Sequence, residues 1–114
     1  MTRIATLARI TARPGQFEAL LEETRRFLTQ IDSEQGTEFF AVNVAADIPE
    51  TLWFYEIYRD ESALQAHVSS EAMATYAAAL GSLAEPDIEV LRVAPEAIRG
   101  SGPVTELPEC EAGR

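Results

Sequence analysis

His67 is the residue in this sequence that is best suited to acid–base chemistry near neutral pH. It is the only histidine among the 114 residues, and imidazole is the side chain that gains and loses a proton in that range without a large shift of its pKa. Two interpretations remain open. His67 either acts on a bound ligand, as a base or as a hydrogen-bonding group, or is satisfied within the fold by Glu56 or by a backbone carbonyl.

Glu56 is the second candidate, because a carboxylate in its position needs a partner. It lies within 51–58 (TLWFYEIY), a short run that is otherwise mainly aromatic and apolar, and burying a charge is costly unless it is paired and hydrogen-bonded. We expect His67 to be that partner. The pair is either a catalytic base with the group that orients it, or a purely structural contact.

A group of mostly aromatic side chains could line a pocket for a flat aromatic ligand. Each of them, taken singly, could equally be an ordinary core residue. The one amide among them, Asn43, could bind a substrate oxygen or could face water at a sheet edge. The candidate substrate-binding residues are Asn43, Phe54, Tyr58, Met73 and Tyr76.

A strand and a helix are the first elements that must position these side chains. Residues 3–12 (RIATLARITA) are rich in β-branched and small apolar residues and stop at Arg13-Pro14-Gly15, which predicts a strand. Residues 16–31 carry apolar side chains at helical spacing and charges on the other face, which predicts an amphipathic helix. Gly36 is expected to mark the end of this helical region.

The next two strands form a predicted hairpin. Residues 37–45 (TEFFAVNVA) and 51–58 both have the composition of strands. The link 46–50 between them contains Pro49, which does not fit a central strand. A short link of this kind predicts that the two strands pair as neighbours.

The chain then returns to helix and strand. The stretch 61–82 is predicted to be helical, with Asp60 as its N-cap and a break at Ser69-Ser70, where Ser70 can cap a second segment. Gly81 is expected to end that segment. Residues 86–94 (PDIEVLRVA) are predicted to form the last strand.

The resulting order, β-α-β-β-α-β, predicts an α+β fold of the ferredoxin-like type. With right-handed crossovers, it gives a four-stranded antiparallel sheet with its helices on one face. The length predicts one domain, which we place at residues 1–94. Residues 95–114 hold three prolines and three glycines. They are either a frayed tail or an arm that wraps a partner subunit through Val104 and Leu107.

A homodimer is expected from the strand 51–58. Side chains alternate along a strand, so Trp53, Tyr55 and Ile57 share one face, opposite the face of Phe54 and Glu56. An antiparallel sheet with one wet face should have a polar side, and this strand has none. A second copy of the chain would bury the apolar patch around Trp53, Tyr55 and Ile57. The alternative is that the tail covers it.

Composition excludes several classes of function. The formal net charge of −10 disfavours nucleic acid and anionic membranes as partners. No apolar run approaches the ~18–20 residues that span a bilayer, so a cytoplasmic protein is expected. With Cys110 as the single cysteine and a lone histidine, we expect no metal site. No phosphate loop, nucleotide fingerprint or hydrolase motif is present.

The stretch 52–80 resembles the antibiotic biosynthesis monooxygenase family. The run Leu52-Trp53-Phe54-Tyr55-Glu56-Ile57-Tyr58 is similar to the family's third strand, and His67 follows Glu56 by eleven residues, in a helix. Pro14-Gly15 before the first helix also matches. The resemblance implies a dimeric α+β barrel whose best-known members oxidise phenols, quinols or anthrones with molecular oxygen and without a cofactor. It makes His67 and Glu56 the candidate catalytic residues.

The sequence also departs from the family pattern. Many members carry a second histidine five positions after the first, where this chain has Ala72. Haem-degrading members use an asparagine and a tryptophan near the positions of Ala8 and Tyr58, which disfavours haem. The resemblance implies a cofactor-independent monooxygenase acting on a small aromatic substrate. The alternatives are a non-catalytic small-molecule-binding or accessory dimer, and an isomerase or cyclase on the same fold.

Overall fold

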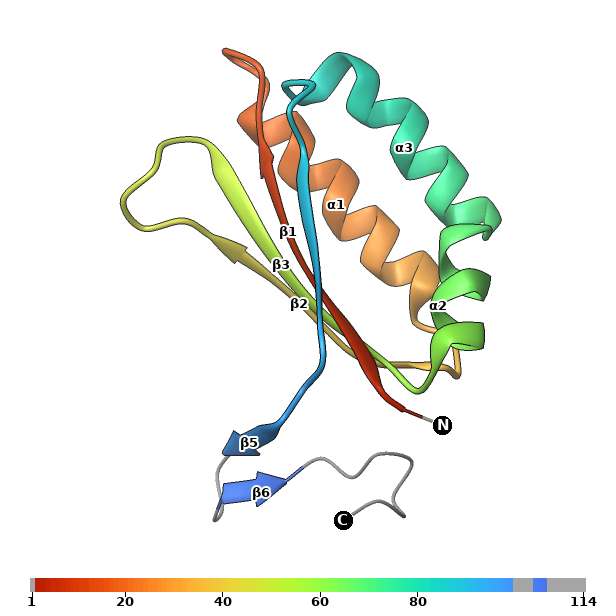
Figure 1. Cartoon of the computed structure of the whole chain (residues 1–114). Coiled ribbons are helices and arrows are strands. Elements are labelled where there is room, and N and C mark those ends of the chain that lie inside the picture. Colours follow the sequence, from red (N-terminus) through yellow and green to blue (C-terminus); the bar gives the residue numbers. More distant parts are fainter. Residues whose placement is uncertain (1, 100–103, 107–114) are drawn as a thin grey trace.

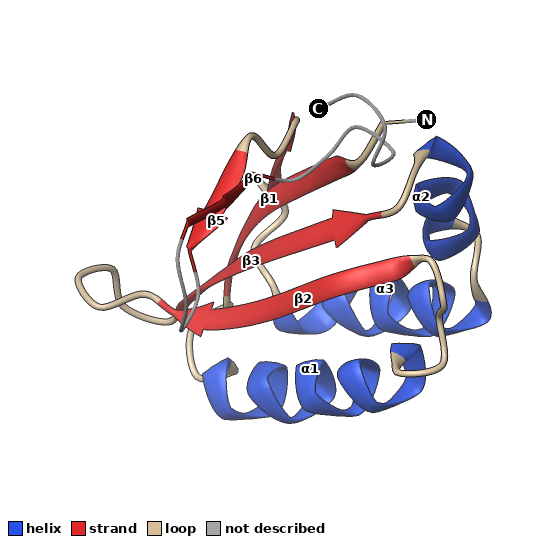
Figure 2. Cartoon of the chain, turned by 90° about the horizontal axis from the view of Figure 1, so that it is seen from below, coloured by secondary structure: helices blue, strands red, loops and turns tan. Residues whose placement is uncertain are grey.

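The computed structural model describes residues 2–99 and 104–106. It contains a four-stranded antiparallel sheet in the order β2-β3-β1-β4, with all helices on one face (Figures 1 and 2). This arrangement confirms the predicted ferredoxin-like α+β fold. The main elements are β1 (Ile4–Thr11), α1 (Phe17–Ile31), β2 (Thr37–Val44), β3 (Thr51–Tyr58), α2 (Glu61–Val68), α3 (Glu71–Leu83) and β4 (Glu89–Val93).

The predicted helix break at Ser69-Ser70 is confirmed, and local capping explains it. The Asp60 carboxylate accepts a hydrogen bond from the Ala63 backbone N–H at 2.8 Å and starts α2. The Ser70 hydroxyl accepts from the Met73 N–H at 3.1 Å and starts α3. Because each cap satisfies a backbone donor that the helix cannot, the chain forms two helices here rather than one.

The prediction that Gly81 ends the helix is wrong. Helix α3 runs on to Leu83, and Ala84 follows it in an extended conformation. The Ala84 N–H still bonds to the Leu80 carbonyl at 2.9 Å. Helical hydrogen bonding therefore continues past the glycine, since glycine weakens a helix without forbidding it.

The core lies between the sheet and α1 and α3. Helix α1 presents Leu20, Thr24, Phe27 and Ile31 as a buried stripe, which packs on strand residues such as Leu52 and Phe54. The predicted amphipathic pattern of this helix is confirmed. None of the helices in the described part of the chain has the length and apolarity required to cross a bilayer.

The far face of the sheet remains partly apolar in the single chain. Trp53 is 37% exposed, Phe39 42% and Leu91 60%, and none of the helices of residues 2–99 covers this face (Figure 2). Ile57, the third residue of the expected dimer interface, is only 4% exposed in the chain by itself. It therefore offers little surface to a partner, whereas Trp53 does.

A short hairpin that the sequence did not predict follows β4. Strands β5 (Ala97–Arg99) and β6 (Val104–Glu106) pair antiparallel as a separate two-stranded sheet, apart from the main one (Figure 1). Part of the expected tail is thus regular structure. Leu107 and Cys110 lie outside the described residues.

Candidate active site

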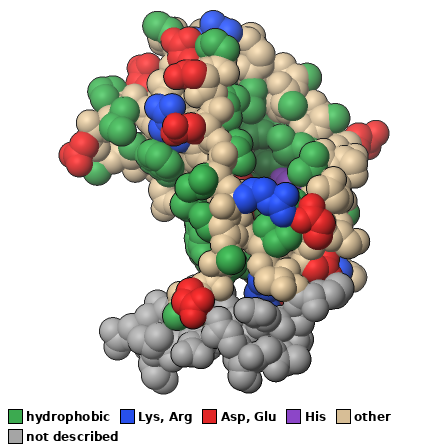
Figure 3. Space-filling model, in the orientation of Figure 1, with side chains coloured by type: hydrophobic (Ala, Val, Ile, Leu, Met, Phe, Trp, Pro, Cys, Tyr) green, Lys and Arg blue, Asp and Glu red, His purple; other side chains and the backbone are tan. Residues whose placement is uncertain are grey.

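A cavity of about 660 Å³ opens between the sheet and helices α2 and α3. Its walls are mostly apolar side chains from the sheet and from α1, α2 and α3, and Figure 3 shows the hollow on the surface of the molecule. The volume lies within the range of pockets that hold small organic ligands. The cavity is therefore the natural place to look for a site.

The floor of the cavity is arranged in rows across the sheet. Arg92 of β4 pairs with Thr6 of β1, which pairs with Glu56 of β3, so these three polar side chains share the helix-facing side in one row. In the next row, Ala8 lies between Val90 and Phe54. Because the side chain of Ala8 is small, the cavity is deeper above Ala8 than above Val90 and Phe54. The cavity thus has a polar end and an apolar centre.

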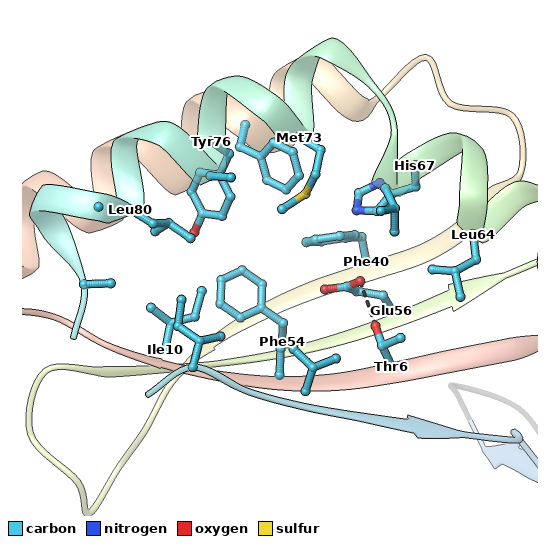
Figure 4. A pocket seen from close by; sticks show the side chains of 18 of the residues that line it. Thr6, Ile10, Phe40, Phe54, Glu56, Leu64, His67, Met73, Tyr76 and Leu80 are labelled. Carbon is cyan, nitrogen blue, oxygen red and sulfur yellow. Dashed lines mark hydrogen bonds between the residues drawn. The ribbon is translucent and has the colours of Figure 1, made fainter. Parts of the chain in front are cut away.

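His67 projects into the polar end from the last turn of α2 (Figure 4). Its side chain is 6% exposed. The rings of Phe27, Phe40 and Tyr58 surround it, with ring-centroid distances of 5.8, 6.0 and 5.1 Å. Packing on several sides fixes the orientation of the imidazole.

The partner of His67 is Glu34 and not Glu56, so the expected Glu56–His67 pair is wrong. The Nδ1 atom of His67 lies 2.8 Å from Glu34 Oε1, which also accepts a hydrogen bond from the Thr37 hydroxyl at 2.8 Å. A carboxylate at Nδ1 favours the tautomer in which Nδ1 carries the proton. The Nε2 atom is then an acceptor, and it faces the cavity (Figure 4).

Sequence reasoning did not identify Glu34 as a site residue, because nothing in the residues around it indicates such a role. It lies in the polar connection between α1 and β2, 33 positions before His67. The one available signal was Gly36. A Cβ atom at Gly36 would lie 2.5 Å from the Cβ of Ala63 in α2, and the Arg59 N–H bonds to the Gly36 carbonyl at 2.9 Å. Glycine therefore allows this connection to pack on α2 and brings Glu34 to His67.

Glu56 is held by two hydroxyl groups instead. Its Oε1 accepts from the Thr6 hydroxyl at 2.8 Å and from the Tyr58 hydroxyl at 2.5 Å. Burial, together with the negative charge and hydrogen bond of Glu56, raises the pKa of Tyr58 well above its ordinary value. Tyr58 therefore stays a donor. Both hydroxyls converge on one oxygen of Glu56, and the carboxylate lies in the cavity below His67 (Figure 4).

The structure brings three of the five predicted substrate-binding residues to the cavity. Phe54, Met73 and Tyr76 line it. Tyr76 stacks on Phe27 at a centroid distance of 4.4 Å, and its hydroxyl lies 2.7 Å from that of Thr24. Burial is the main reason that the pKa of Tyr76 rises to about 12.

The two other predicted residues lie elsewhere. Tyr58 is fully buried behind Glu56 and packs with Ala63 and Leu64, so it supports the site without lining it. Asn43 pairs in register with Trp53 on the opposite face of the sheet, where its side chain donates to the Trp53 carbonyl at 3.3 Å. The assignment of Asn43 to substrate binding is wrong, because strand parity turns it away from the cavity.

A match to known proteins now decides the family. The model of the antibiotic biosynthesis monooxygenase family matches residues 3–79, which is more than half of the chain. The chain belongs to this family. The matched region contains His67, Glu34 and Glu56, and it ends before β4.

Solved structures similar to this chain share the family fold. Rv0793 from Mycobacterium tuberculosis is 27% identical with a TM-score of 0.76, over 89% of this chain and 100% of that one. NE2512 from Nitrosomonas europaea, a protein of unknown function, is 25% identical with a TM-score of 0.78, over 90% and 98%. PA3566 from Pseudomonas aeruginosa is 23% identical with a TM-score of 0.75, over 82% and 94%. Among curated proteins there is no significant match.

The cavity of this chain holds a strand glutamate, Glu56, and a helix histidine, His67. Ala72, where many members carry a second histidine, packs against the core. Across the residues that the structure describes, no three His, Cys, Asp or Glu side chains are grouped to hold a metal ion. His67 and Glu56 line the polar end of the cavity, and Glu34 is hydrogen-bonded to His67.

Proposed function

We propose that this member of the antibiotic biosynthesis monooxygenase family is a cofactor-independent monooxygenase. Its substrate is a small aromatic molecule with an acidic hydrogen, such as a quinol, a phenol or an anthrone, and molecular oxygen is the oxidant. One observation carries the proposal: Nε2 of His67 faces an apolar cavity while Glu34 holds Nδ1 at 2.8 Å. This is the geometry of an oriented general base.

The first step is removal of a proton. A substrate C–H or O–H that reaches Nε2 of His67 gives up its proton there, and Glu34 stabilises the imidazolium that forms. The low polarity of the cavity strengthens these electrostatic interactions. Glu56, on the opposite wall, accepts a hydrogen bond from a second substrate hydroxyl and so fixes the orientation of the ring.

The second step is electron transfer to oxygen. The substrate anion passes one electron to O₂, and the resulting radical and superoxide combine through a new C–O bond. For an anthrone-type carbon, the O–O bond of this peroxide then breaks, and water leaves with the remaining hydrogen of that carbon. The sum is R₂CH₂ + O₂ → R₂C=O + H₂O. Electrons balance without a further reductant, and the protein supplies the base, the position and the dry surroundings.

Oxygen uptake with anthrone and a naphthohydroquinone tests the proposal. After subtraction of the spontaneous rate, we expect turnover by the wild type and a loss of about 10²- to 10⁴-fold in kcat for His67→Ala. Ala8→Leu raises the cavity floor and should also suppress turnover. Asn43→Ala, on the other sheet face, should keep it. Full turnover by His67→Ala contradicts the assignment of the base.

A second candidate is a binding protein that has kept the fold without the chemistry. The observation that favours it is Ala72, in place of the second histidine of many family members. This candidate predicts that naphthols and anthrones bind in calorimetry and that Ala8→Leu abolishes binding. It also predicts oxygen uptake no faster than the spontaneous rate.

We also propose that the protein works as a homodimer. The supporting observation is the exposed apolar far face of the sheet, where Phe39 and Trp53 lie on the neighbouring strands β2 and β3, and Leu91 lies on β4 beyond β1. Phe39 and Tyr55 pack edge to face at 5.8 Å and continue this surface. A second copy of the same face would remove the patch from water.

A further inference from the structure

We propose that Arg92 is a specificity-determining residue that binds an anionic group, such as a carboxylate, on the aromatic substrate. This inference rests on the proposed function, because it assumes an aromatic ligand in the same cavity. It adds the charge of that ligand and its direction in the site. Arg92 lies in β4, beyond the residues that the family model matches.

The position of Arg92 is the first argument. It is the outermost member of the polar row Arg92–Thr6–Glu56, and it lines the same cavity as His67. Neighbouring strands lie about 4.8 Å apart, so the backbone positions of Arg92 and Glu56 are separated by about 10 Å across the sheet. That separation matches the long dimension of a two-ring aromatic molecule with a substituent at each end.

The present partner of Arg92 is the second argument. Its Nη2 donates to Glu61 Oε1 at 2.5 Å, and Glu61 belongs to the first turn of α2. The two side chains are 56% and 52% exposed. Figure 3 shows basic and acidic side chains together at the edge of the hollow, with the histidine deeper inside. An exposed ion pair contributes little to stability, so a ligand carboxylate can take the place of Glu61 at small cost.

The distribution of charge in the cavity is the third argument. Of the described residues that line it, only Arg13 and Arg92 carry a permanent positive charge. Arg13 lies at the other end, where it donates to the Gly81 carbonyl at 3.2 Å and pairs with Glu85. Deeper in the polar end, Glu56 repels an anion. A negative substituent is therefore attracted to Arg92 and kept away from the reaction centre.

These points fix the direction of the ligand. Its acidic hydroxyl or carbon lies at His67 and Glu56, its rings fill the apolar space above Ala8, and its anionic substituent points outward to Arg92. A guanidinium suits this task, because its planar N–H groups match a carboxylate. Glu61 then acts as the counter-ion of the empty site.

The test uses 6-hydroxy-2-naphthoic acid and its methyl ester, which differ in charge and share the rings and the hydroxyl. In calorimetry, we expect the wild type to bind the acid about fivefold more tightly than the ester. This preference should shrink at high salt, since the contact is exposed. Arg92→Gln should abolish it and leave ester binding unchanged. Arg13→Gln, the matched control, should keep it.

A second variant separates charge from packing. Glu61→Gln removes the competing carboxylate and should tighten binding of the acid alone. Equal affinity of the wild type for acid and ester, or an unchanged preference in Arg92→Gln, overturns this inference and leaves the proposed function standing. If the wild type binds neither probe, the cavity is not a site for such aromatic ligands, and this inference is contradicted as well.

Discussion

At the scale of the residue, one hydrogen bond decides what His67 can do. Its Nδ1 lies 2.8 Å from Glu34, so its Nε2 is the nitrogen available to a ligand. Glu56 carries two hydroxyl donors on one oxygen and remains an acceptor in the same space. The site thus pairs a base with a hydrogen-bond acceptor, which suits a substrate that has two polar groups.

The variant Glu34→Gln should distinguish a role of Glu34 in positioning His67 for catalysis from a purely structural role. Loss of the charge removes the group that stabilises the imidazolium, so kcat/KM should fall about tenfold or more, with a smaller change in KM. Thr37→Val removes a neighbouring hydrogen bond without changing charge and should leave kcat/KM close to that of the wild type. A kcat/KM of Glu34→Gln equal to that of the wild type excludes this role.

Tyr76 gives a prediction for alkaline stability. Burial is the main cause that raises its pKa in the folded chain to about 12, from an ordinary value of 10.0. The raised pKa means that its stabilising effect is complete below about pH 10 and is lost as the pH rises through about 12. At pH 11 the loss is about 1 kcal/mol.

Urea unfolding at pH 8 and pH 11 measures this loss. The free energy of unfolding of the wild type should drop between the two, and that of Tyr76→Phe should drop by about 1 kcal/mol less. The chain has no lysine, so no lysine titration obscures this window. Equal drops in the two proteins contradict the prediction.

At the scale of the element, the connection between α1 and β2 acts as a support for the site. It reaches α2 only because Gly36 has no side chain: an added Cβ would lie 2.5 Å from that of Ala63. The same contact holds Glu34 beside His67. A loop of unremarkable composition thus controls the orientation of the base.

Gly36→Ala should therefore affect both stability and activity. Overpacking against α2 should lower the free energy of unfolding by about 1–3 kcal/mol, and displacement of Glu34 should lower kcat/KM. Gly81→Ala is the matched control, because a Cβ there meets nothing within 4 Å and alanine stabilises a helix interior by about 0.5–1 kcal/mol. Denaturant unfolding and oxygen uptake measure the two effects. The same stability change in both variants contradicts the close-packing argument.

At the scale of the whole molecule, the sheet separates two surfaces with different tasks. One face meets the helices and forms the cavity, and the other presents Trp53, Phe39 and Leu91 to solvent. A patch of this kind on a monomer favours association. The proposed dimer would leave the two cavities on the outside of the assembly, away from the joined faces.

Tyr55→Glu tests the assembly. The register partners of Tyr55, Leu7 and Ala41, are uncharged, so a carboxylate buried there between the joined faces lacks a partner. Sedimentation at micromolar concentration should show dimers for the wild type and monomers for the variant. Val68→Glu, on the exposed part of α2, should stay dimeric. A monomeric wild type removes the basis for the dimer.

Much of the fold could be read from local patterns. The strand of 51–58, the amphipathic helix that ends at Ile31 and the capped break at Ser70 are all confirmed. These features depend on neighbours within a few positions, and periodicity and capping report such neighbours. The predicted end of α3 at Gly81 was wrong because tertiary packing overrode the weak preference of glycine. The β5–β6 hairpin was not predicted because its sequence has no strong strand pattern.

The sequence by itself determined the elements, the family resemblance and the identity of His67 and Glu56 as candidates. Only the tertiary structure decided their partners: Glu34 for His67, Thr6 and Tyr58 for Glu56, and Arg92 at the open end. It also turned Asn43 away from the cavity. The physical reason is that hydrogen bonds join groups by distance and direction in space. Thr6 and Glu56 are 50 positions apart along the chain, and sheet register alone makes them neighbours.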